Sequence, residues 1–120
     1  MPTICHFEVP ADDIQRAKKF YEQLFGWKIE LFPQMEYYGI DTGAGDKGVC
    51  GGLMKRQQPQ QPILNYIDCE CVETYSQKVK DLGGQVVMGK TAVPGMGWFA
   101  ICLDSENNAF GLWESDAKAK

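Results

Sequence analysis

The sequence predicts an α+β fold in which one unit, a strand followed by a helix and three further strands (βαβββ), occurs twice. Three observations support this prediction: the order of predicted elements repeats, each half has one amphipathic helix ending at glycine, and glycines recur at a nearly constant separation. Gly26 and Gly83 end the helices, 83 − 26 = 57 residues apart, and Gly52 and Gly111 stand near the ends of the halves, 111 − 52 = 59 residues apart. Accidental similarity within a sandwich of four plus four strands is the alternative.

The first strand and the first helix define two surfaces. Phe7 and Val9 point to one side of the strand and His6 and Glu8 to the other, because successive side chains of a strand alternate. A helix follows over residues 14–25, and its apolar stripe should pack on the Phe7 side. That stripe consists of Ile14, Ala17, Phe20, Tyr21, Leu24 and Phe25. His6 and Glu8 then face away from the helix, toward water or toward a pocket.

The other elements follow from alternation, glycine and proline. In the first half we expect strands over 27–32, 35–42 and 49–55, with a turn at 33–34 and a glycine-rich loop at 42–48. A polar, proline-bearing segment at 57–62 should link the halves. In the second half we expect a strand at 63–71, a helix at 72–82, strands at 85–93, 98–104 and 109–114, and a frayed tail at 115–120.

Length and charge restrict the class of protein. A chain of 120 residues forms one domain, with a first module of about 1–57, a linker at 57–62 and a second module of about 63–115. The net charge of −4 and the absence of a basic cluster argue against nucleic acid or a membrane surface as partner. No apolar run approaches the ~20 residues of a membrane span, and the N-terminus lacks a signal-peptide layout. We therefore expect a cytoplasmic protein.

The five cysteines are expected to be reduced core residues. Their number is odd and none has the paired spacing of a zinc site. Cys69 and Cys71 share one face of a predicted strand, which is a weak metal or redox signal. We interpret this pair as packing residues, because free cysteine behaves as a small hydrophobic side chain.

Several segments together resemble a known superfamily. Residues 104–110 read Asp-Ser-Glu-Asn-Asn-Ala-Phe, close to an Asp-Pro-Glu-Gly-Asn-x-Phe pattern, and Asn107 can adopt the left-handed conformation of the glycine that it replaces. Similar motifs occur at 6–9, 20–22, 24–27, 82–84 and 94–100. On these residues the chain resembles the vicinal oxygen chelate superfamily, which includes glyoxalase I, bleomycin and fosfomycin resistance proteins, methylmalonyl-CoA epimerase and extradiol dioxygenases.

The resemblance implies a fold, an assembly and a metal site. In this glyoxalase/bleomycin resistance fold the two modules form a cupped, barrel-like mixed sheet with helices outside, and the cup encloses the substrate. Members of this length usually form homodimers. Enzymes of the superfamily hold a divalent metal through four strands, and the four positions fall here on His6, Gly52 (or its neighbour Gly51), Leu64 and Gly111. Glycine and leucine side chains have no donor atom, so we expect neither this metal site nor another cofactor.

A rearranged metal site is the alternative. His6 and Glu8 would then recruit Asp68 or Tyr66 from the matching strand of the second module. One imidazole with oxygen ligands would suit Mn, Mg or Fe. Hydrogen bonding of His6 inside a polar cavity is the simpler interpretation.

Polar side chains on the faces opposite the helices predict a ligand cavity. Gly51, Gly52 and Gly111 should widen it by removing side chains, and Tyr37 and Met96 could also line it. The candidate ligand-binding residues are His6, Glu8, Tyr66, Asp68, Met54, Trp98 and Trp113. For each aromatic residue, ordinary core or interface packing is the competing role.

Three functions follow from the resemblance. The first is a protein that binds a small molecule without metal, as bleomycin resistance proteins do, with a cationic or polyhydroxylated ligand suggested by the acidic residues. The second is a metal-dependent glyoxalase-like lyase, epimerase or isomerase with Glu8 as the candidate catalytic base. The third is a non-catalytic or regulatory dimer module. A dioxygenase is disfavoured, because its iron needs two histidines and the chain has one.

Overall fold

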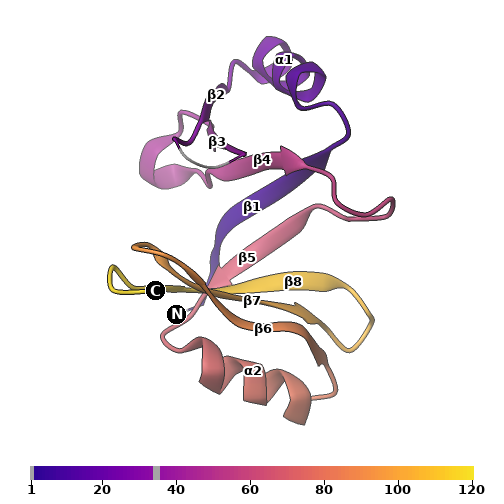
Figure 1. Ribbon diagram of the computed structural model, residues 1–120, viewed down its shortest axis with the longest axis vertical. Coiled ribbons are helices and arrows are strands. Elements are labelled where there is room, and N and C mark those ends of the chain that lie inside the picture. The colour runs from indigo at the N-terminus through magenta and orange to yellow at the C-terminus, as the bar shows by residue number, and fades with distance from the viewer. Residues whose placement is uncertain (1, 34–35) are drawn as a thin grey trace. The chain divides into compact units, whose positions relative to one another are not determined.

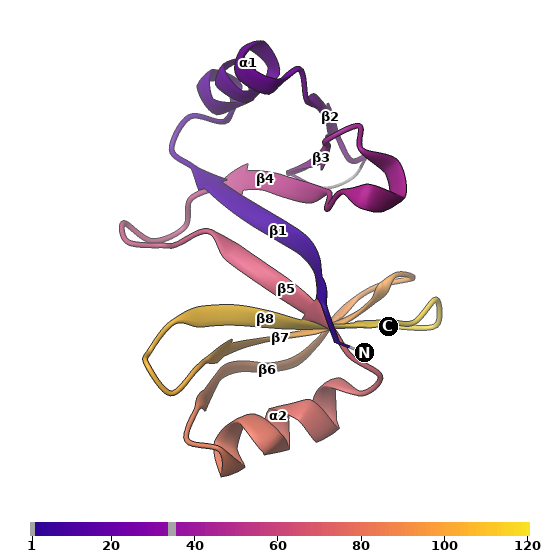
Figure 2. The same ribbon diagram turned by 180° about the vertical axis from the view of Figure 1, so that it is seen from behind.

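The computed structural model describes residues 2–33 and 36–120, and over these residues the elements follow the predicted order (Figure 1 and Figure 2). The α+β class and the two βαβββ modules are thereby confirmed. The predicted turn at 33–34 and the predicted strand start at residue 35 involve residues outside the described ranges. The first half contains β1 (Ile4–Ala11), α1 (Ile14–Phe25), β2 (Lys28–Leu31), β3 (Tyr37–Asp41), a 3-10 turn (Gly45–Lys47) and β4 (Gly51–Lys55). The second contains β5 (Leu64–Asp68), α2 (Val72–Asp81), β6 (Gln85–Val93), β7 (Gly97–Leu103) and β8 (Ala109–Ser115).

The chain divides into two compact units. The first module comprises residues 6–63, and the second comprises residues 2–5 together with 64–120. The segment predicted to link the halves is a hydrogen-bonded turn of the first module: the Gln57 N–H donates to Gln61 Oε1 at 2.7 Å, and Arg56 Nη1 donates to the Gln61 carbonyl at 2.6 Å. Among the described residues, neither helix is long and apolar enough to cross a membrane.

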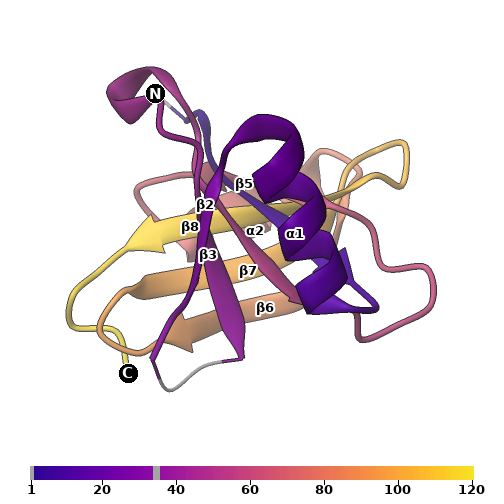
Figure 3. The same ribbon diagram turned by 90° about the horizontal axis from the view of Figure 1, so that it is seen from above.

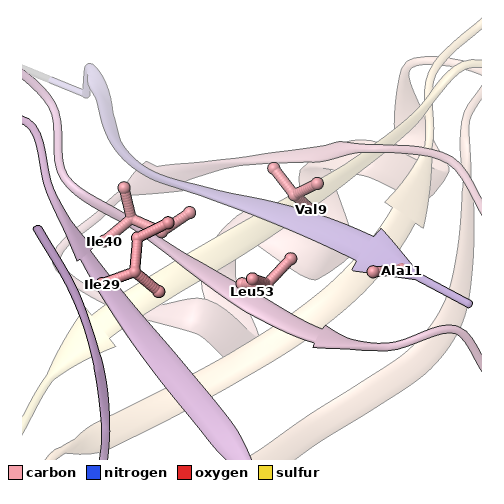
Figure 4. Close-up of a cluster of buried hydrophobic side chains, with 5 residues drawn as sticks. All are labelled: Val9, Ala11, Ile29, Ile40 and Leu53. Atoms are coloured by element: carbon pink, nitrogen blue, oxygen red, sulfur yellow. The ribbon is translucent and has the colours of Figure 1, made fainter. Parts of the chain in front are cut away.

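The sheet of the first module has the strand order β2-β3-β4-β1. β1 runs parallel to β4, and the other neighbours are antiparallel. One face carries the core, against which Phe7, Ile14, Ala17 and Tyr21 pack. Figure 4 shows the buried residues of this core, Val9, Ala11, Ile29, Ile40 and Leu53. Phe7 and Val9 therefore face the helix, as their alternation with His6 and Glu8 predicts.

Helix α1 has the predicted ends but a different buried face. Asp13 caps its N-terminus by accepting the Arg16 N–H at 3.0 Å, and Gly26 ends it in the left-handed conformation at φ 71°. Three residues of the predicted stripe, Phe20, Leu24 and Phe25, are 57–58% exposed. This part of the prediction is wrong because the sheet covers only the part of the stripe around Ile14, Ala17 and Tyr21. Phe25 packs instead on Trp27, with ring centroids 4.9 Å apart.

The sheet of the second module has the order β5-β8-β7-β6. β5 runs parallel to β8, whereas β8, β7 and β6 are antiparallel neighbours that lie side by side in Figure 3. Its core consists of Val72, Ala100, Cys102 and Leu112, with Tyr75 and Val79 of α2 packed against it. The register repeats that of the first module: Glu8 lies beside Gly52 and Tyr66 lies beside Gly111.

The turn that joins β7 to β8 confirms one sequence prediction. Asn107 has φ 65° and is, within the described ranges, the one non-glycine residue with positive φ. The Asp104 carboxylate accepts the N–H groups of Glu106 and Asn108 at 2.8 and 2.9 Å. The hydrogen bond from the Asn108 N–H, followed in importance by that from the Glu106 N–H, lowers the pKa of the Asp104 carboxyl.

The C-terminal segment is ordered, so the expectation of a frayed tail is wrong. The Gly95 N–H donates to the Ala119 carbonyl at 2.9 Å, and the Asp116 N–H donates to the Met96 carbonyl at 2.9 Å. Ala119 is 4% exposed. These backbone hydrogen bonds hold residues 116–119 against the turn between β6 and β7, and local composition does not reveal such partners.

The cysteines are free, as expected, but they are not all core residues. Cys102 is buried in the second module and Cys69 packs against the same core. Cys71 is the N-cap residue of α2, and Cys50 is exposed just before β4. Of the five cysteines, Cys102 alone is fully buried, so strand-like sequence around a cysteine did not by itself predict burial.

Candidate functional site

A hydrogen-bond chain lies on the face of the first module opposite its core. β1 supplies His6 and Glu8, and β3 supplies Tyr37. His6 Nε2 lies 2.6 Å from the Tyr37 hydroxyl oxygen, and this hydroxyl lies 3.0 Å from Glu8 Oε2. All three side chains are half-buried. Tyr37 thus joins the two polar residues that the alternation of β1 had placed on one face.

Proton counting gives the chain a direction. A carboxylate only accepts hydrogen bonds, so the Tyr37 hydroxyl donates its single proton to Glu8. The Tyr37 oxygen then accepts from His6, which carries its proton on Nε2. Burial lowers the pKa of His6, which favours the neutral imidazole, and the neutral ring can serve as this donor in its Nε2–H tautomer.

Gly52 provides the space in which Tyr37 sits. A Cβ atom at residue 52 would overlap the hydroxyl end of the Tyr37 ring. The ring also contacts Phe32, with centroids 5.8 Å apart. The expectation that Gly52 widens a cavity is therefore wrong, because a tyrosine fills the space that the absent side chain leaves.

The second module repeats this arrangement with other residues. A Cβ atom at Gly111 would overlap the ring of Tyr66, and Tyr66 is 8% exposed. Its ring meets Phe99 edge-on, with centroids 6.4 Å apart. At Gly51 a Cβ atom would likewise overlap Phe7. All three glycines that were expected to enlarge a cup accommodate aromatic rings.

The remaining candidate residues are divided between the two faces of the second module. Asp68 and Trp113 are register partners and share the face of Tyr66. Asp68 accepts the Thr3 N–H at 2.7 Å, and Trp113 donates its ring N–H to Ser115 Oγ at 3.0 Å. Trp98 instead packs against the α2 core, beneath the ammonium of Lys90 at 4.5 Å.

Trp98 is therefore not on the face that carries Tyr66. Its ring N–H donates to Asp116 Oδ2 at 3.0 Å, so it helps to hold the C-terminal segment. In the first module Met54 lies opposite Tyr37 in the register of β3 and β4. Leu64, at the start of β5, is 8% exposed.

An open depression of about 430 Å³ lies at the turn after β4. Arg56, which lines it, pairs with Asp12 at 3.0 Å and also binds the Gln61 carbonyl. Its other lining residues are Asp12, Gln57, Gln58 and Pro59. None of the residues predicted to bind a ligand lines this depression, and its one basic group is already paired.

Sequence reasoning named Tyr37 as a possible lining residue but missed its place between His6 and Glu8. The signal available in the sequence was that a predicted strand with Tyr37 precedes a predicted strand with two glycines, Gly51 and Gly52. A glycine in a strand interior often marks the close approach of another group. The register that pairs Tyr37 with Met54, two residues from Gly52, comes only from the folded sheet, and the Tyr37 ring reaches from there over Gly52.

Comparisons with known proteins agree with this fold. Residues 3–43 match the family model "Bleomycin resistance protein-like N-terminal". A putative glyoxylase of Mycobacterium bovis is 30% identical over 115 residues, which cover 91% of this chain and 44% of the relative. A glyoxalase/bleomycin resistance protein/dioxygenase superfamily member from Vibrio splendidus has a similar structure, with a TM-score of 0.66, 14% identity, and coverage of 97% of this chain and 100% of that one. These matches support membership of the vicinal oxygen chelate superfamily.

Two further facts qualify the relationship. Methylmalonyl-CoA epimerase from Mycobacterium tuberculosis shares the fold with a TM-score of 0.67 and 10% identity, over 94% of this chain and 87% of the epimerase. The chain spans less than half the length of the M. bovis relative. Superfamily membership therefore supplies a fold, and the chemistry must be argued from the residues of this chain.

The residues at the superfamily's metal positions do not fit a metal ion. His6 can offer a ring nitrogen, but Gly52, Leu64 and Gly111 offer no side-chain donor. Tyrosine rings also occupy the space above both glycines. Over residues 2–33 and 36–120, no group of three or more His, Cys, Asp or Glu side chains is arranged to hold a metal.

Proposed function

We propose that this chain binds a small organic molecule on the helix-opposed faces of its modules, and that it does so without a divalent metal. The observation that carries this proposal is the His6–Tyr37–Glu8 chain, a half-buried set of polar groups on a face that packs no helix. Partly buried polar groups are costly unless they are hydrogen-bonded, so such a set is commonly retained for recognition. Tyr66, Asp68, Met54 and Trp113 are the further candidate contacts.

Two lines of support favour binding over metal chemistry. The donor set at the superfamily's ligand positions is reduced to His6, and the match to a bleomycin resistance protein-like model points to a binding protein. The hydrogen-bond chain needs no cation to satisfy its members.

A thermal-shift screen against small metabolites and antibiotics tests the binding function. A ligand present at 100 times its dissociation constant adds ~2.7 kcal/mol to the free energy of unfolding and raises Tm. We expect hits whose effect is lost in the Glu8→Gln variant and kept in Glu30→Gln, which changes an exposed carboxylate on β2. The proposal would be contradicted if no ligand raised Tm, or if the ligands that raise the Tm of the wild type raised that of Glu8→Gln equally.

A metal-dependent glyoxalase-like lyase, isomerase or epimerase is the second candidate. It is favoured by the name of the M. bovis relative and by the structural likeness to methylmalonyl-CoA epimerase. Glu8 would then be the base. The proton that Tyr37 donates to Glu8 argues against this role, because a hydrogen bond to the carboxylate weakens it as a base.

Pairing with a second copy of the chain completes the proposal, and a non-catalytic dimer module is the third candidate function. The exposed Phe20, Leu24 and Phe25 of α1 are compatible with a partner surface. Light scattering gives the mass in solution. A dimer that binds none of the screened ligands would favour the third candidate over the first.

A further inference from the structure

Three cysteines lie near the short connection between β5 and α2 (Figure 1). Cys69 directly follows β5 and packs against the core of the second module, in which Cys102 is buried. Cys71 is the N-cap residue of α2 and is half-buried. Cys69 interacts electrostatically with both of the other thiols. The fold thus places a cluster of thiols at this connection, and the function proposed above uses none of them.

The spacing of Cys69 and Cys71 is within the range that a disulfide can bridge. Two residues of a fully extended chain span at most ~7 Å between Cα atoms, and a disulfide joins Cα atoms about 4.4–6.8 Å apart. The chain bends at Glu70, the one residue between the cysteines, so it is not fully extended here. The Cys71 backbone N–H also donates to the Cys69 sulfur, which places that sulfur beside residue 71.

The two thiols differ in their readiness to ionise. Hydrogen bonds from Thr74, that of its side chain first and that of its backbone N–H second, lower the pKa of Cys71. The Glu114 carboxylate on β8 acts in the opposite direction, and the Lys90 ammonium on β6 also interacts with Cys71. Burial raises the pKa of Cys69. Because the thiolate is the reactive form, Cys71 is the thiol of the pair that an oxidant attacks first.

We propose that Cys69 and Cys71 are a redox-active pair, in which hydrogen peroxide oxidises Cys71 and Cys69 then closes a reversible disulfide. In the first step the Cys71 thiolate attacks one peroxide oxygen, the O–O bond breaks and hydroxide leaves, so Cys71 becomes a sulfenic acid. In the second step the Cys69 sulfur attacks the Cys71 sulfur, the S–O bond breaks, and the departing oxygen and the Cys69 proton form water. The two thiols lose two electrons, and one peroxide is reduced to two waters.

The surroundings of the pair favour a bond that is readily reduced again. The disulfide would enclose only Glu70, which is exposed, and Cys71 is half-buried, so small thiols can reach it. Strained or exposed disulfides have more oxidising potentials than buried structural ones and are more easily reduced. We therefore expect glutathione to restore both thiols.

Tryptic peptides separate this pair from the other cysteines. Cleavage after Arg56 and Lys78 releases residues 57–78, which contain Cys69 and Cys71 and no other cysteine. The other three fall in separate peptides, Cys5 in 1–16, Cys50 in 48–55 and Cys102 in 91–118. A disulfide within the pair lowers the mass of one peptide by two hydrogens, whereas any other pairing joins two peptides.

The test treats the reduced full chain with hydrogen peroxide, alkylates the remaining thiols and maps the peptides by mass spectrometry. In the wild type we expect the mass loss in peptide 57–78 while Cys50 is still alkylated, and its reversal by glutathione. Cys50→Ser removes an exposed thiol outside the cluster and should leave the yield of disulfide unchanged.

Two variants separate the two steps. Cys71→Ser keeps an oxygen at the N-cap position of α2 and should abolish the disulfide. Cys69→Ala removes the second thiol, so Cys71 should remain a sulfenic acid that dimedone labels.

The proposal is overturned if Cys50 or Cys102 is oxidised faster than Cys71, or if peptide 57–78 is joined to another peptide. It is also overturned if the wild type accumulates sulfinic acid at Cys71 without a disulfide. An equal rate of disulfide formation in urea would show that the fold does not select the pair, which contradicts the proposal as well. Should Cys71→Ser not fold, the wild-type peptide map and Cys69→Ala decide the question.

Discussion

At the scale of single residues, the two glycines beside Glu8 and Tyr66 provide the space for two tyrosine rings. Each lies in a parallel strand pair, and the space over each is filled by a tyrosine ring. A metal-ligating side chain at residue 52 would require the Tyr37 ring to move from its present position. A longer side chain at residue 52 and the present position of Tyr37 therefore exclude each other.

Gly52→Ala should destabilise the protein by about 1–3 kcal/mol, because the new methyl group overpacks the seat of Tyr37. Urea unfolding measures the change. Gly89→Ala is the control: a Cβ atom there meets nothing within 4 Å, and its φ is not in the left-handed region. Equal stabilities of Gly52→Ala and the wild type would mean that the ring does not occupy this space.

His6 should make stability depend on pH. Its pKa is lowered in the folded protein, so on acidification the unfolded chain takes up the proton first, near its ordinary value of about 6.5. The free energy of unfolding of the wild type should therefore fall as pH drops through this value and level off below the folded pKa. His6→Gln keeps a donor for Tyr37 but does not titrate. Urea unfolding from pH 8 to 5 gives the free energy of unfolding of both proteins. The wild-type value should fall relative to that of His6→Gln as the pH drops, and a difference that does not change with pH would contradict this expectation.

At the scale of elements, sequence patterns located helices and strands well where their signals are local. The ends of α1 follow from Asp13 and Gly26, and the turn at Asn107 follows from the need for positive φ. The exposed half of the α1 stripe and the anchored tail were not predictable in this way. Both depend on which surface a distant segment covers, and periodicity records only which residues share a face.

Asp13→Ala should cost about 0.5–2 kcal/mol, because it leaves the Arg16 N–H of the first turn without its cap. Asp12→Ala changes the neighbouring carboxylate, which is 72% exposed and pairs with Arg56, so its effect should be smaller. Thermal unfolding followed by circular dichroism compares the two. A larger loss in Asp12→Ala would show that the cap is not the dominant contribution.

At the scale of the whole molecule, the duplication was predictable and the site only in part. Alternation along β1 placed His6 and Glu8 on one face, and repeated spacing found both glycines. Tyr37 joins this pair through the register of β3 against β4, and Trp98 lies on the face of β7 that carries Ala100 and Cys102 toward α2. The register of two strands cannot be read from either strand alone, so the sequence identified candidate groups but not their partners.

Metal content tests the proposal for the intact protein. Protein purified without chelator should contain well under one equivalent of Mn, Fe, Ni or Zn per chain by elemental analysis, because the described residues offer no donor set of three or more. Added Mn²⁺ or Zn²⁺ should leave Tm unchanged below millimolar concentration. About one metal per chain, lost in a His6 variant, would instead favour the lyase or isomerase.

The placement of Tyr37 on β3 puts the proposed binding site next to an outer strand of the first module. β3 is held on one side by β2, an outer strand of four residues, and the Phe32 N–H donates to the Tyr37 carbonyl at 2.9 Å near the end of that ladder. Short outer strands open readily in native-state fluctuations. A ligand that contacts the Tyr37 side chain would therefore stabilise the pairing of β2 with β3. Amide hydrogen exchange over residues 28–32 and 37–41 should then be slower in the ligand-bound protein than in the free protein.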